Sequence, residues 1–341
     1  MRILEVSRYK KNAPKGISPF VCEQGESLRT AGCEVDYFLV KGNYLKAVRP
    51  LKAKIMEFKP DIVHAHYGLS AITAELQGLV PVVTTFHNGE TLNWHVNLIA
   101  SLMSLRAKHV IYVAQHIRDL SYFKAQHYSI IPCGVPMEQM TIIPKDEARR
   151  QLGWDPNKKY ILFGGAFANT RKNYALLREA VQRLNEGMSR AGALNEPLTL
   201  NDGSEQFGNI VCVEMKGLSR AECVLRMCAC DLFALPSHSE GSPQALKEAV
   251  ACNCPCLATD IADVRELFGD EPGHWILRNP RKTHERWDGD EHSLDEMVEL
   301  LRKALAFEGR TKGRERILEL ELSNEQVAQR LIKIYEDIIK R

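Results

Sequence analysis

Short apolar runs alternate with segments of helical periodicity along most of the chain, and this alternation constrains the fold more than any other feature. It is typical of parallel α/β architecture, because each crossover between neighbouring parallel strands needs a helix. Residues 132–144 contain three prolines and a glycine without helical periodicity, which indicates a linker. We therefore expect two doubly wound α/β domains with a cleft between them, over residues 1–140 and 145–322.

The expected strands are short and apolar, and three helix starts carry a capping-box pattern, in which a serine is followed three residues later by Glu or Gln. The capping boxes begin at Ser219, Ser293 and Ser323. Residues 278–292 are polar and are expected to form a loop. The expected strands are residues 2–7, 34–40, 62–65, 80–85, 109–113 and 129–131 in the first domain, and 160–163, 198–200, 210–213, 232–235, 255–258 and 275–277 in the second.

Composition excludes several other classes of protein. The net charge of +2 is too near neutral for a dedicated nucleic-acid binder. No apolar run approaches the ~20 residues of a membrane span, and the first residues show no basic-then-apolar signal, so we expect a cytoplasmic protein. The ten cysteines form no C-x-x-C pair, and the cluster at residues 252–256 fits small buried side chains better than a metal or redox site.

Residues 235–248 place a polar loop between a strand and a helix. We expect Ser242 as the N-cap and Pro243 as the first helical residue. The free N–H groups and the positive dipole end of such a helix make an anion site. Glu240 precedes this helix and Glu248 lies about 9 Å along its axis, so a bound anion would have a carboxylate on each side. Spacing alone leaves open a second interpretation, in which both glutamates are solvated surface acids.

Residues 236–267 as a whole resemble the signature of the retaining GT-B glycosyltransferases of glycosyltransferase family 4. The family pattern P-S-x-x-E-G, followed by E-A-x-A-x-x-x-P, reads PSHSEGSPQALKEAVACNCP at residues 236–255. The resemblance implies a GT-B fold of two Rossmann-like domains, with a nucleotide-sugar donor bound mainly by the second. It implies that Glu240 orients the donor sugar and that Glu248 fixes the ribose. The helix start beside the diphosphate would comprise Gly241, Ser242, Pro243 and Gln244.

Two further pairs in the second domain resemble family motifs. Gly164 and Gly165 resemble its glycine strand end, and Arg171 and Lys172 resemble its basic pair. The resemblance implies that the two cations hold the donor diphosphate, where they would stabilise the departing nucleoside diphosphate. The family usually has glycine at the next position, where this chain has Asn173.

In the first domain, residues 12–32 resemble the family's glycine loop and first helix, and residues 84–87 resemble a strand end with a histidine in the cleft. The resemblance implies that Gly16 lets backbone amides approach the diphosphate. It implies that His87 contacts the donor sugar or the reacting centre, whereas His64 and His66 are expected to be mainly structural. The last helix, residues 323–341, would pack back on the first domain.

The resemblance implies a metal-independent, retaining hexosyltransferase that needs no cofactor. Its substrates would be a nucleotide-sugar donor, with a UDP-sugar favoured over a GDP-sugar, and a glycan or lipid-linked acceptor in bacterial surface polysaccharide synthesis. The expected catalytic residues are Glu240, His87, Arg171 and Lys172. Three alternatives remain: a glycoside hydrolase, a nucleotide-sugar epimerase and a non-catalytic nucleotide-sugar-binding subunit. A dehydrogenase is not expected, because no G-x-G-x-x-G follows a predicted strand.

Charge is distributed unevenly along the chain. Residues 1–140 carry a net charge of +5, from 16 Lys and Arg against 11 Asp and Glu. Residues 41–59 read as a basic amphipathic helix that starts or kinks at Pro50. Such a helix can lie on an anionic membrane surface or acceptor, or it can be a solvated helix packed on the sheet. The cations concerned are Lys46, Arg49, Lys52 and Lys54.

Overall fold

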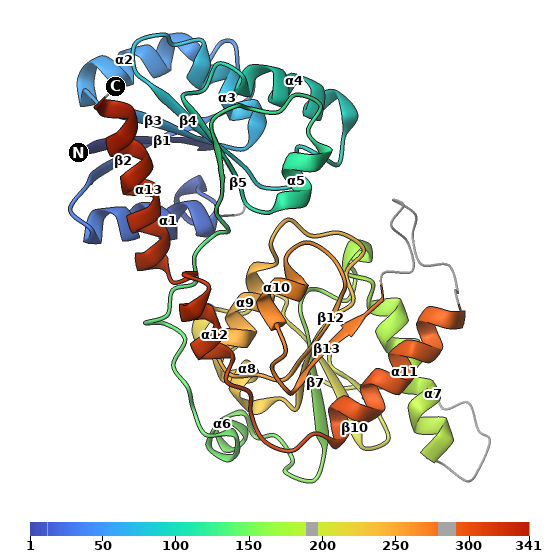
Figure 1. The fold of residues 1–341 in the computed structure, drawn as a ribbon. Helices are drawn as coiled ribbons and strands as arrows, with labels where there is room; N and C mark the ends of the chain where they lie inside the picture. Colours follow the sequence, from blue (N-terminus) through green and yellow to red (C-terminus); the bar gives the residue numbers. More distant parts are fainter. Residues whose placement is uncertain (12, 189–196, 279–290, 341) are drawn as a thin grey trace. The chain divides into compact units, whose positions relative to one another are not determined.

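The computed structural model describes residues 1–11, 13–188, 197–278 and 291–340, and the chain divides into two compact units (Figure 1). Unit 1 comprises Met1–Pro136 and Glu321–Arg341, and unit 2 comprises Met137–Leu320. The division falls inside the proline-rich segment 132–144. Asn12, the first residue of the expected glycine loop, and most of the expected loop 278–292 lie outside the described residues.

Unit 1 contains a six-stranded parallel sheet with the order β2-β1-β3-β4-β5-β6. Strand β1, next to the edge strand β2, pairs with β2 and β3, so that Ile3 lies between Val35 and Ile62. The strands match the expected ones to within two residues at each end. They are β1 (Arg2–Arg8), β2 (Glu34–Val40), β3 (Ile62–His66), β4 (Val82–Phe86), β5 (His109–Tyr112) and β6 (Tyr128–Ile130).

Helices cover both faces of this sheet. On one face, α1 (Pro19–Thr30) and the C-terminal helix α13 (Asn324–Ile339) share a core cluster that contains Leu28, Leu331 and Tyr335. On the other face, α2 (Val48–Phe58) contributes Leu51 and Ile55 to a second cluster. The remaining helices of the unit are α3 (Gly68–Glu75), α4 (Trp94–Ser104) and α5 (Gln115–Leu120).

Helix α2 bears on the membrane interpretation of the basic segment. Pro50 lies in its first turn, where proline is tolerated, so it starts the helix rather than kinking it. The apolar face of the helix is buried in the core through Leu51 and Ile55. Lys54 pairs with Asp36, with Nζ and Oδ2 2.7 Å apart. The exposed side of α2 carries the cations Lys46, Arg49 and Lys52 at and near its start together with the apolar Met56.

Unit 2 contains a seven-stranded sheet with the order β13-β12-β11-β7-β10-β9-β8, which is parallel except at β9 and β8. The sequence did not predict β9, a three-residue strand between two turns. The strands are β7 (Lys159–Phe163), β8 (Leu198–Thr199), β9 (Glu205–Phe207), β10 (Ile210–Glu214), β11 (Leu232–Leu235), β12 (Cys256–Thr259) and β13 (His274–Leu277).

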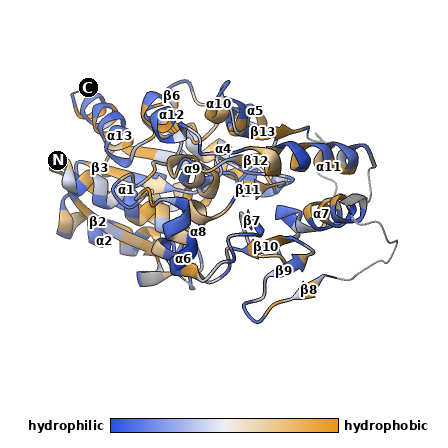
Figure 2. Ribbon diagram, turned by 90° about the horizontal axis from the view of Figure 1, so that it is seen from below, coloured by the Kyte–Doolittle hydropathy of each residue, from blue (hydrophilic) through white to orange (hydrophobic). Residues whose placement is uncertain are grey.

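Helices α7 (Tyr174–Met188) and α11 (Glu291–Ala306) are amphipathic and pack their apolar residues on this sheet. Figure 2 shows hydrophilic and hydrophobic residues mixed along their ribbons. The capping boxes at Ser219 and Ser323 are confirmed. The one at Ser293 is wrong, because α11 already includes Glu291, so Ser293 lies inside the first turn. The helices are α6 (Lys145–Leu152), α7 (Tyr174–Met188), α8 (Arg220–Ala229), α9 (Gln244–Ala251), α10 (Val264–Phe268), α11 (Glu291–Ala306) and α12 (Gly313–Glu319), with a 3₁₀ turn, η2, at Thr170–Lys172.

Candidate active site

In unit 2 the candidate residues follow the carboxyl ends of β7 and β11, where open α/β sheets bind ligands. Strand β7 runs into Gly164 and Gly165. A Cβ on Gly164 would lie 2.7 Å from the Phe233 ring, and one on Gly165 would lie 3.0 Å from Lys172 Cγ. Both glycines therefore let neighbouring side chains pack closely against the backbone at the end of β7. The structure gives Gly165 a direct role in seating Lys172.

The basic pair lies on η2, and Asn173 explains how the turn forms without the family's glycine. Asn173 has a left-handed backbone with φ 57° and ψ 48°, and asparagine tolerates this region better than most residues. The side chain of Asn169 accepts a hydrogen bond from the Arg171 backbone N–H at the start of the turn, 3.2 Å away. Asparagines thus fix the turn at both ends.

Lys172 and Glu240 form the central contact of the site. Lys172 Nζ donates to Glu240 Oε1 across 2.7 Å, and both side chains are largely buried. A backbone hydrogen bond from His238 N to Arg171 O, 2.9 Å long, joins the same two segments. Arg171 is exposed, and its guanidinium makes no ion pair with any residue that the structure describes. One cation is thus anchored to the glutamate while the other points to solvent.

Helix α9 starts one residue later than expected. Its N-cap is Pro243 and its first residue is Gln244. The prediction that Ser242 caps the helix is wrong, because the Ser242 hydroxyl instead donates to Asp263 Oδ2, 2.6 Å away. Asp263 Oδ1 is buried without a partner among the described residues. Because Pro243 is the N-cap of α9, no N-cap side chain accepts a hydrogen bond from the backbone N–H groups of its first turn.

Glu248 is held by an arginine that sequence reasoning missed. Glu248 is 8% exposed, and its Oε1 accepts from Arg220 Nη1 across 2.5 Å. Burial raises the pKa of the Glu248 carboxyl, and the Arg220 guanidinium opposes this shift. Arg220 begins α8, 28 residues upstream, in a segment whose only sequence signal is its capping box. The structure does not support a solvated Glu248.

In unit 1, Glu90 organises the carboxyl ends of β3 and β4. Its carboxylate accepts hydrogen bonds from the backbone N–H groups of Gly68, His87 and Asn88, at 2.8, 3.2 and 3.0 Å. Tyr67 (φ 68°) and Asn88 (φ 143°), next to these hydrogen bonds, have positive φ. Such a backbone conformation costs free energy and is common at functional sites. The sequence analysis assigned no role to Glu90. Its hydrogen bonds hold the strained backbone that follows β3 and β4.

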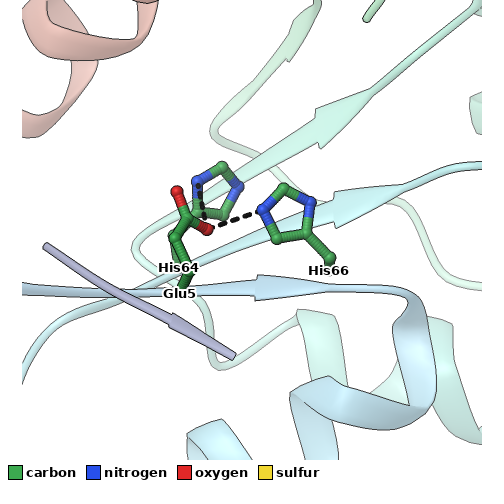
Figure 3. A group of neighbouring side chains, drawn as sticks. All are labelled: Glu5, His64 and His66. Carbon is green, nitrogen blue, oxygen red and sulfur yellow. Dashed lines mark hydrogen bonds and ion pairs between the residues drawn. The ribbon is translucent and has the colours of Figure 1, made fainter. Parts of the chain in front are cut away.

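His87 belongs to a hydrogen-bond network that runs back to β1 through His66. Figure 3 shows the inner part of this network, Glu5, His64 and His66. Glu5 Oε2 lies 2.6 Å from His66 Nε2. Since an ionised carboxylate only accepts, this nitrogen of His66 carries the proton. With the proton on Nε2, His66 Nδ1 is the acceptor toward His87 Nε2, 3.2 Å away, and His87 Nδ1 lies 3.7 Å from Cys133 Sγ. The network thus orients the His87 ring toward the interior of unit 1.

Glu5, His64 and His66 form the one group among the described residues with the ligand spacing of a metal site. Hydrogen bonds already use the nitrogens of both histidines. His64 lies 2.6 Å from Tyr335 Oη and 2.7 Å from Thr85 Oγ1, and burial holds its pKa well below the ordinary value. We interpret the group as a closed hydrogen-bond network between β1, β3 and α13.

A pocket of about 560 Å³ in unit 1 is lined in part by Tyr67 and Glu90. Its cations are Arg8, Lys10 and Lys11, and none of them forms an ion pair with a described residue. Gly16 lies next to it with φ 74°, and a Cβ there would lie 2.2 Å from the Tyr9 ring. Gly16 therefore makes room for Tyr9, whose ring also lies 4.8 Å below Lys41 Nζ. The pocket is lined by tyrosines and by more cations than acids, since Glu90 is the one acid among its described lining residues.

Two models of known protein families match this chain. The model described as "Glycosyl transferases group 1" matches residues 144–286, and the model described as "Glycosyltransferase Family 4" matches residues 35–139. The chain belongs to the group 1 glycosyltransferases of family 4. The second match covers β3 and β4 of unit 1, which lead to the histidines of the network, and the first covers the paired glutamates of unit 2.

Two curated relatives of this chain come from bacteria. The putative teichuronic acid biosynthesis glycosyltransferase TuaC of Bacillus subtilis is 27% identical over 237 residues, which are 63% of this chain and 57% of the relative. A D-inositol 3-phosphate glycosyltransferase of Mycolicibacterium smegmatis is 26% identical over 235 residues, which are 62% of this chain and 54% of the relative. The matches thus span less than three fifths of these two relatives.

Solved structures show the fold. A sucrose-phosphate synthase from Thermosynechococcus elongatus aligns with a TM-score of 0.74 and 16% identity, covering 99% of both chains. HepE from Anabaena, in complex with UDP and glucose, aligns with a TM-score of 0.67 and 15% identity, covering 99% of this chain and 100% of that one. The GT-B fold of two Rossmann-like domains is confirmed.

Proposed function

We propose that this glycosyltransferase transfers a hexose from a nucleoside-diphosphate sugar to a glycan or lipid-linked acceptor, with retention of anomeric configuration and without a metal ion. The observation that carries the proposal is the pairing of Glu240 with Lys172 and of Glu248 with Arg220 on either side of the start of α9. Each pair holds a carboxylate in place at a helix end that favours anions.

In this proposal the donor diphosphate lies at the start of α9, beside Arg171 and Lys172. The exposed Arg171 supplies a positive charge that no described residue neutralises. Glu240 accepts hydrogen bonds from sugar hydroxyls, and Glu248 accepts them from ribose hydroxyls. The buried, unpartnered Asp263 Oδ1 offers a further acceptor for a ligand hydroxyl. Orienting the donor this way lowers the entropic part of the barrier.

The chemical step requires the bond between C1 of the sugar and the diphosphate oxygen to break, with its electron pair leaving on that oxygen. The acceptor hydroxyl oxygen forms the new bond to C1 on the same face, and its proton passes to the departing diphosphate. Arg171, Lys172 and the N–H groups of α9 stabilise the growing negative charge. We assign no covalent nucleophile, and these protein charges take the place of a divalent cation.

We infer that the acceptor carries an acidic group and enters the pocket of unit 1. Arg8, Lys10 and Lys11 line it, and Glu90, the only acid among the described lining residues, already accepts from three backbone N–H groups. An anionic acceptor is in keeping with TuaC, a relative named for teichuronic acid biosynthesis, and with synthesis of a bacterial surface polysaccharide. The exposed cations Lys46, Arg49 and Lys52 of unit 1 would add long-range attraction for an anionic acceptor or membrane.

The test is a transfer assay with UDP-, GDP- and ADP-sugars, in EDTA, with acidic and neutral sugar acceptors. The proposal predicts transfer from a UDP-sugar, an unchanged anomeric configuration in the product's NMR spectrum, and a preference for acidic acceptors. Loss of activity in EDTA or an inverted product would contradict the mechanism. Release of the free sugar would indicate a hydrolase, and isomerised donor without acceptor would indicate an epimerase. Donor binding without any turnover would indicate a binding subunit.

A further inference from the structure

Helix α3 ends on a buried carboxyl group that has no partner. Glu75, its last residue, is 7% exposed. Its Oε1 atom is buried and has no hydrogen-bond partner among the residues that the structure describes. Burial raises the pKa of Glu75 to about 8. Because a buried polar group without a partner costs free energy, such groups are rare in native proteins, which makes Glu75 a candidate contact for a ligand.

Glu75 lines a pocket of about 410 Å³ at the amino-terminal edge of the sheet of unit 1. We define this amino-end pocket by Glu75, Gln77, Pro81, Arg106 and Lys108 among its lining residues. Pro81 directly precedes β4, and Lys108 directly precedes β5. The five residues of β4, which span about 16 Å, separate Pro81 from the histidine at the opposite edge of the sheet. The amino-end pocket is therefore separate from the candidate active-site residues of unit 1.

Backbone hydrogen bonds hold the walls of the amino-end pocket in place. The buried Gln77 accepts at Oε1 from the N–H groups of Leu79 and Val80, at 2.6 and 3.0 Å, and donates from Nε2 to Val80 O, 2.6 Å away. On the other side of the pocket, Lys108 N donates to Val82 O across 2.9 Å. The turn before β4 and the start of β5 are thus fixed relative to each other.

Arg106 and Lys108 are the charged groups that act on Glu75. Both are exposed, and the side chain of neither forms an ion pair or a hydrogen bond with a residue that the structure describes. A neighbouring pocket of about 650 Å³ is also lined by these two cations, so they lie where the two pockets meet. Its acid, Asp61, already accepts from Arg2 N across 2.7 Å. Two cations without partners therefore lie beside a carboxyl group that is mostly neutral at pH 7.

We propose that the amino-end pocket binds a small phosphate monoester that carries hydroxyl groups, such as a hexose phosphate. Arg106 and Lys108 bind the phosphate, since a guanidinium group matches phosphate oxygens with two parallel hydrogen bonds. The protonated carboxyl group of Glu75 forms a hydrogen bond with a ligand hydroxyl and does not repel the phosphate. The pocket volume is within the range of small-molecule sites. No aromatic ring is among the described residues that line the pocket, so it offers a nucleobase no stacking surface.

The test is isothermal titration of glucose 1-phosphate, glucose 6-phosphate, glycerol 3-phosphate, inorganic phosphate and glucose into the full chain, with UDP present to fill the proposed donor site. We expect at least one of the three monoesters to bind more tightly than inorganic phosphate, and glucose not to bind. Arg106→Ala/Lys108→Ala should bind that monoester at least about tenfold more weakly. Both residues are exposed, so its melting temperature and its UDP affinity should remain those of the wild type. The matched control is Arg302→Ala/Lys303→Ala on α11, which should bind like the wild type.

Variants of Glu75 test its contact with the ligand hydroxyl. As the carboxyl group ionises between pH 7 and 9, a negative charge develops beside the bound phosphate, so the affinity of the wild type should fall by about tenfold. Glu75→Gln should keep the affinity found at pH 7 and lose this pH dependence. Glu75→Leu should bind the monoester no more tightly than inorganic phosphate, because it has no group to meet the hydroxyl.

The proposal is overturned if none of the three monoesters binds the wild type, or if Arg106→Ala/Lys108→Ala binds as tightly as the wild type. It is also overturned if the affinity of Glu75→Gln falls with pH as steeply as that of the wild type. Loss of binding in Lys10→Ala/Lys11→Ala would overturn it too, since the ligand would then occupy the pocket beside Glu90. UDP binding is measured separately and can persist while monoester binding fails, which separates this proposal from the proposed function.

Discussion

Lys172 donates a hydrogen bond to Glu240 across 2.7 Å, although 68 residues separate the two in the sequence. The contact joins η2, which follows β7, to the loop that follows β11. Because both side chains are largely buried, removing either one leaves the other charge without its partner. The pair therefore couples the proposed diphosphate contact to the proposed sugar contact within unit 2.

Replacement of Lys172 tests this coupling. Lys172→Ala should lower kcat/KM by at least about 100-fold, because it removes a charge that stabilises the leaving diphosphate. Lys172→Arg should retain much of the activity. Steady-state kinetics with the preferred donor measure both, and Arg150→Ala on α6, an exposed residue, serves as the control. A Lys172→Ala enzyme with the kcat/KM of the control would rule out the coupling.

The Arg220–Glu248 pair makes a separate prediction for donor binding. Glu248→Gln removes the charge that the ribose hydroxyls are proposed to meet, and Arg220→Ala removes its support. Both should raise the donor KM by about tenfold or more, with a smaller change in kcat, because the contact is made in the ground state as well. If both variants retain the wild-type KM, the ribose assignment is wrong.

The positions of most strands and the paired glutamates were accessible from sequence because they rest on local patterns. Apolar runs predicted β2 at its true bounds, and the glutamate spacing placed Glu240 and Glu248 around one helix start. Arg220, Glu90 and Glu5 could not be found this way. Each acts through a partner brought near by the sheet, from 28, 22 and 61 residues away respectively, and no local periodicity encodes such a contact.

Asn173 illustrates a different limit of sequence reasoning. The departure from the family's glycine leaves the path of the loop undetermined, yet Asn173 adopts the left-handed backbone that glycine adopts readily. Asn173→Ala should destabilise the protein by about 1–2 kcal/mol, whereas Asn173→Gly should be close to neutral. Urea unfolding of both variants measures this difference. Equal stability of the two variants would show that the turn does not require a left-handed residue.

The buried histidine network gives a spectroscopic prediction. In the wild type, ¹⁵N NMR should find the proton of His66 on Nε2 and that of His87 also on Nε2, since Glu5 accepts at the end of the network. Glu5→Gln removes the acceptor charge, so both histidines should change their tautomer populations. Unchanged ¹⁵N shifts in this variant would mean that Glu5 does not set the orientation of the ring protons.

Glu75 makes the stability of the chain depend on pH. Burial raises its pKa from 4.5 to about 8, so between these values the native state binds more protons than the unfolded state. The free energy of unfolding should therefore fall as the pH rises through this window. Glu75→Gln should remove the dependence and stabilise the protein by roughly 1–3 kcal/mol at pH 8. Chemical denaturation at several pH values measures both, and parallel profiles for the two proteins would contradict the assignment.

The central claim is that the start of α9, with Lys172 and Glu248 beside it, binds a nucleoside diphosphate. Isothermal titration of UDP into the wild type, Lys172→Ala and Glu248→Ala tests it directly. The claim predicts one site per chain, and each variant should bind UDP at least about tenfold more weakly, as expected for loss of a charged contact. If UDP, GDP and ADP all fail to bind the wild type, or if UDP binds both variants with unchanged affinity, the account of this site is wrong.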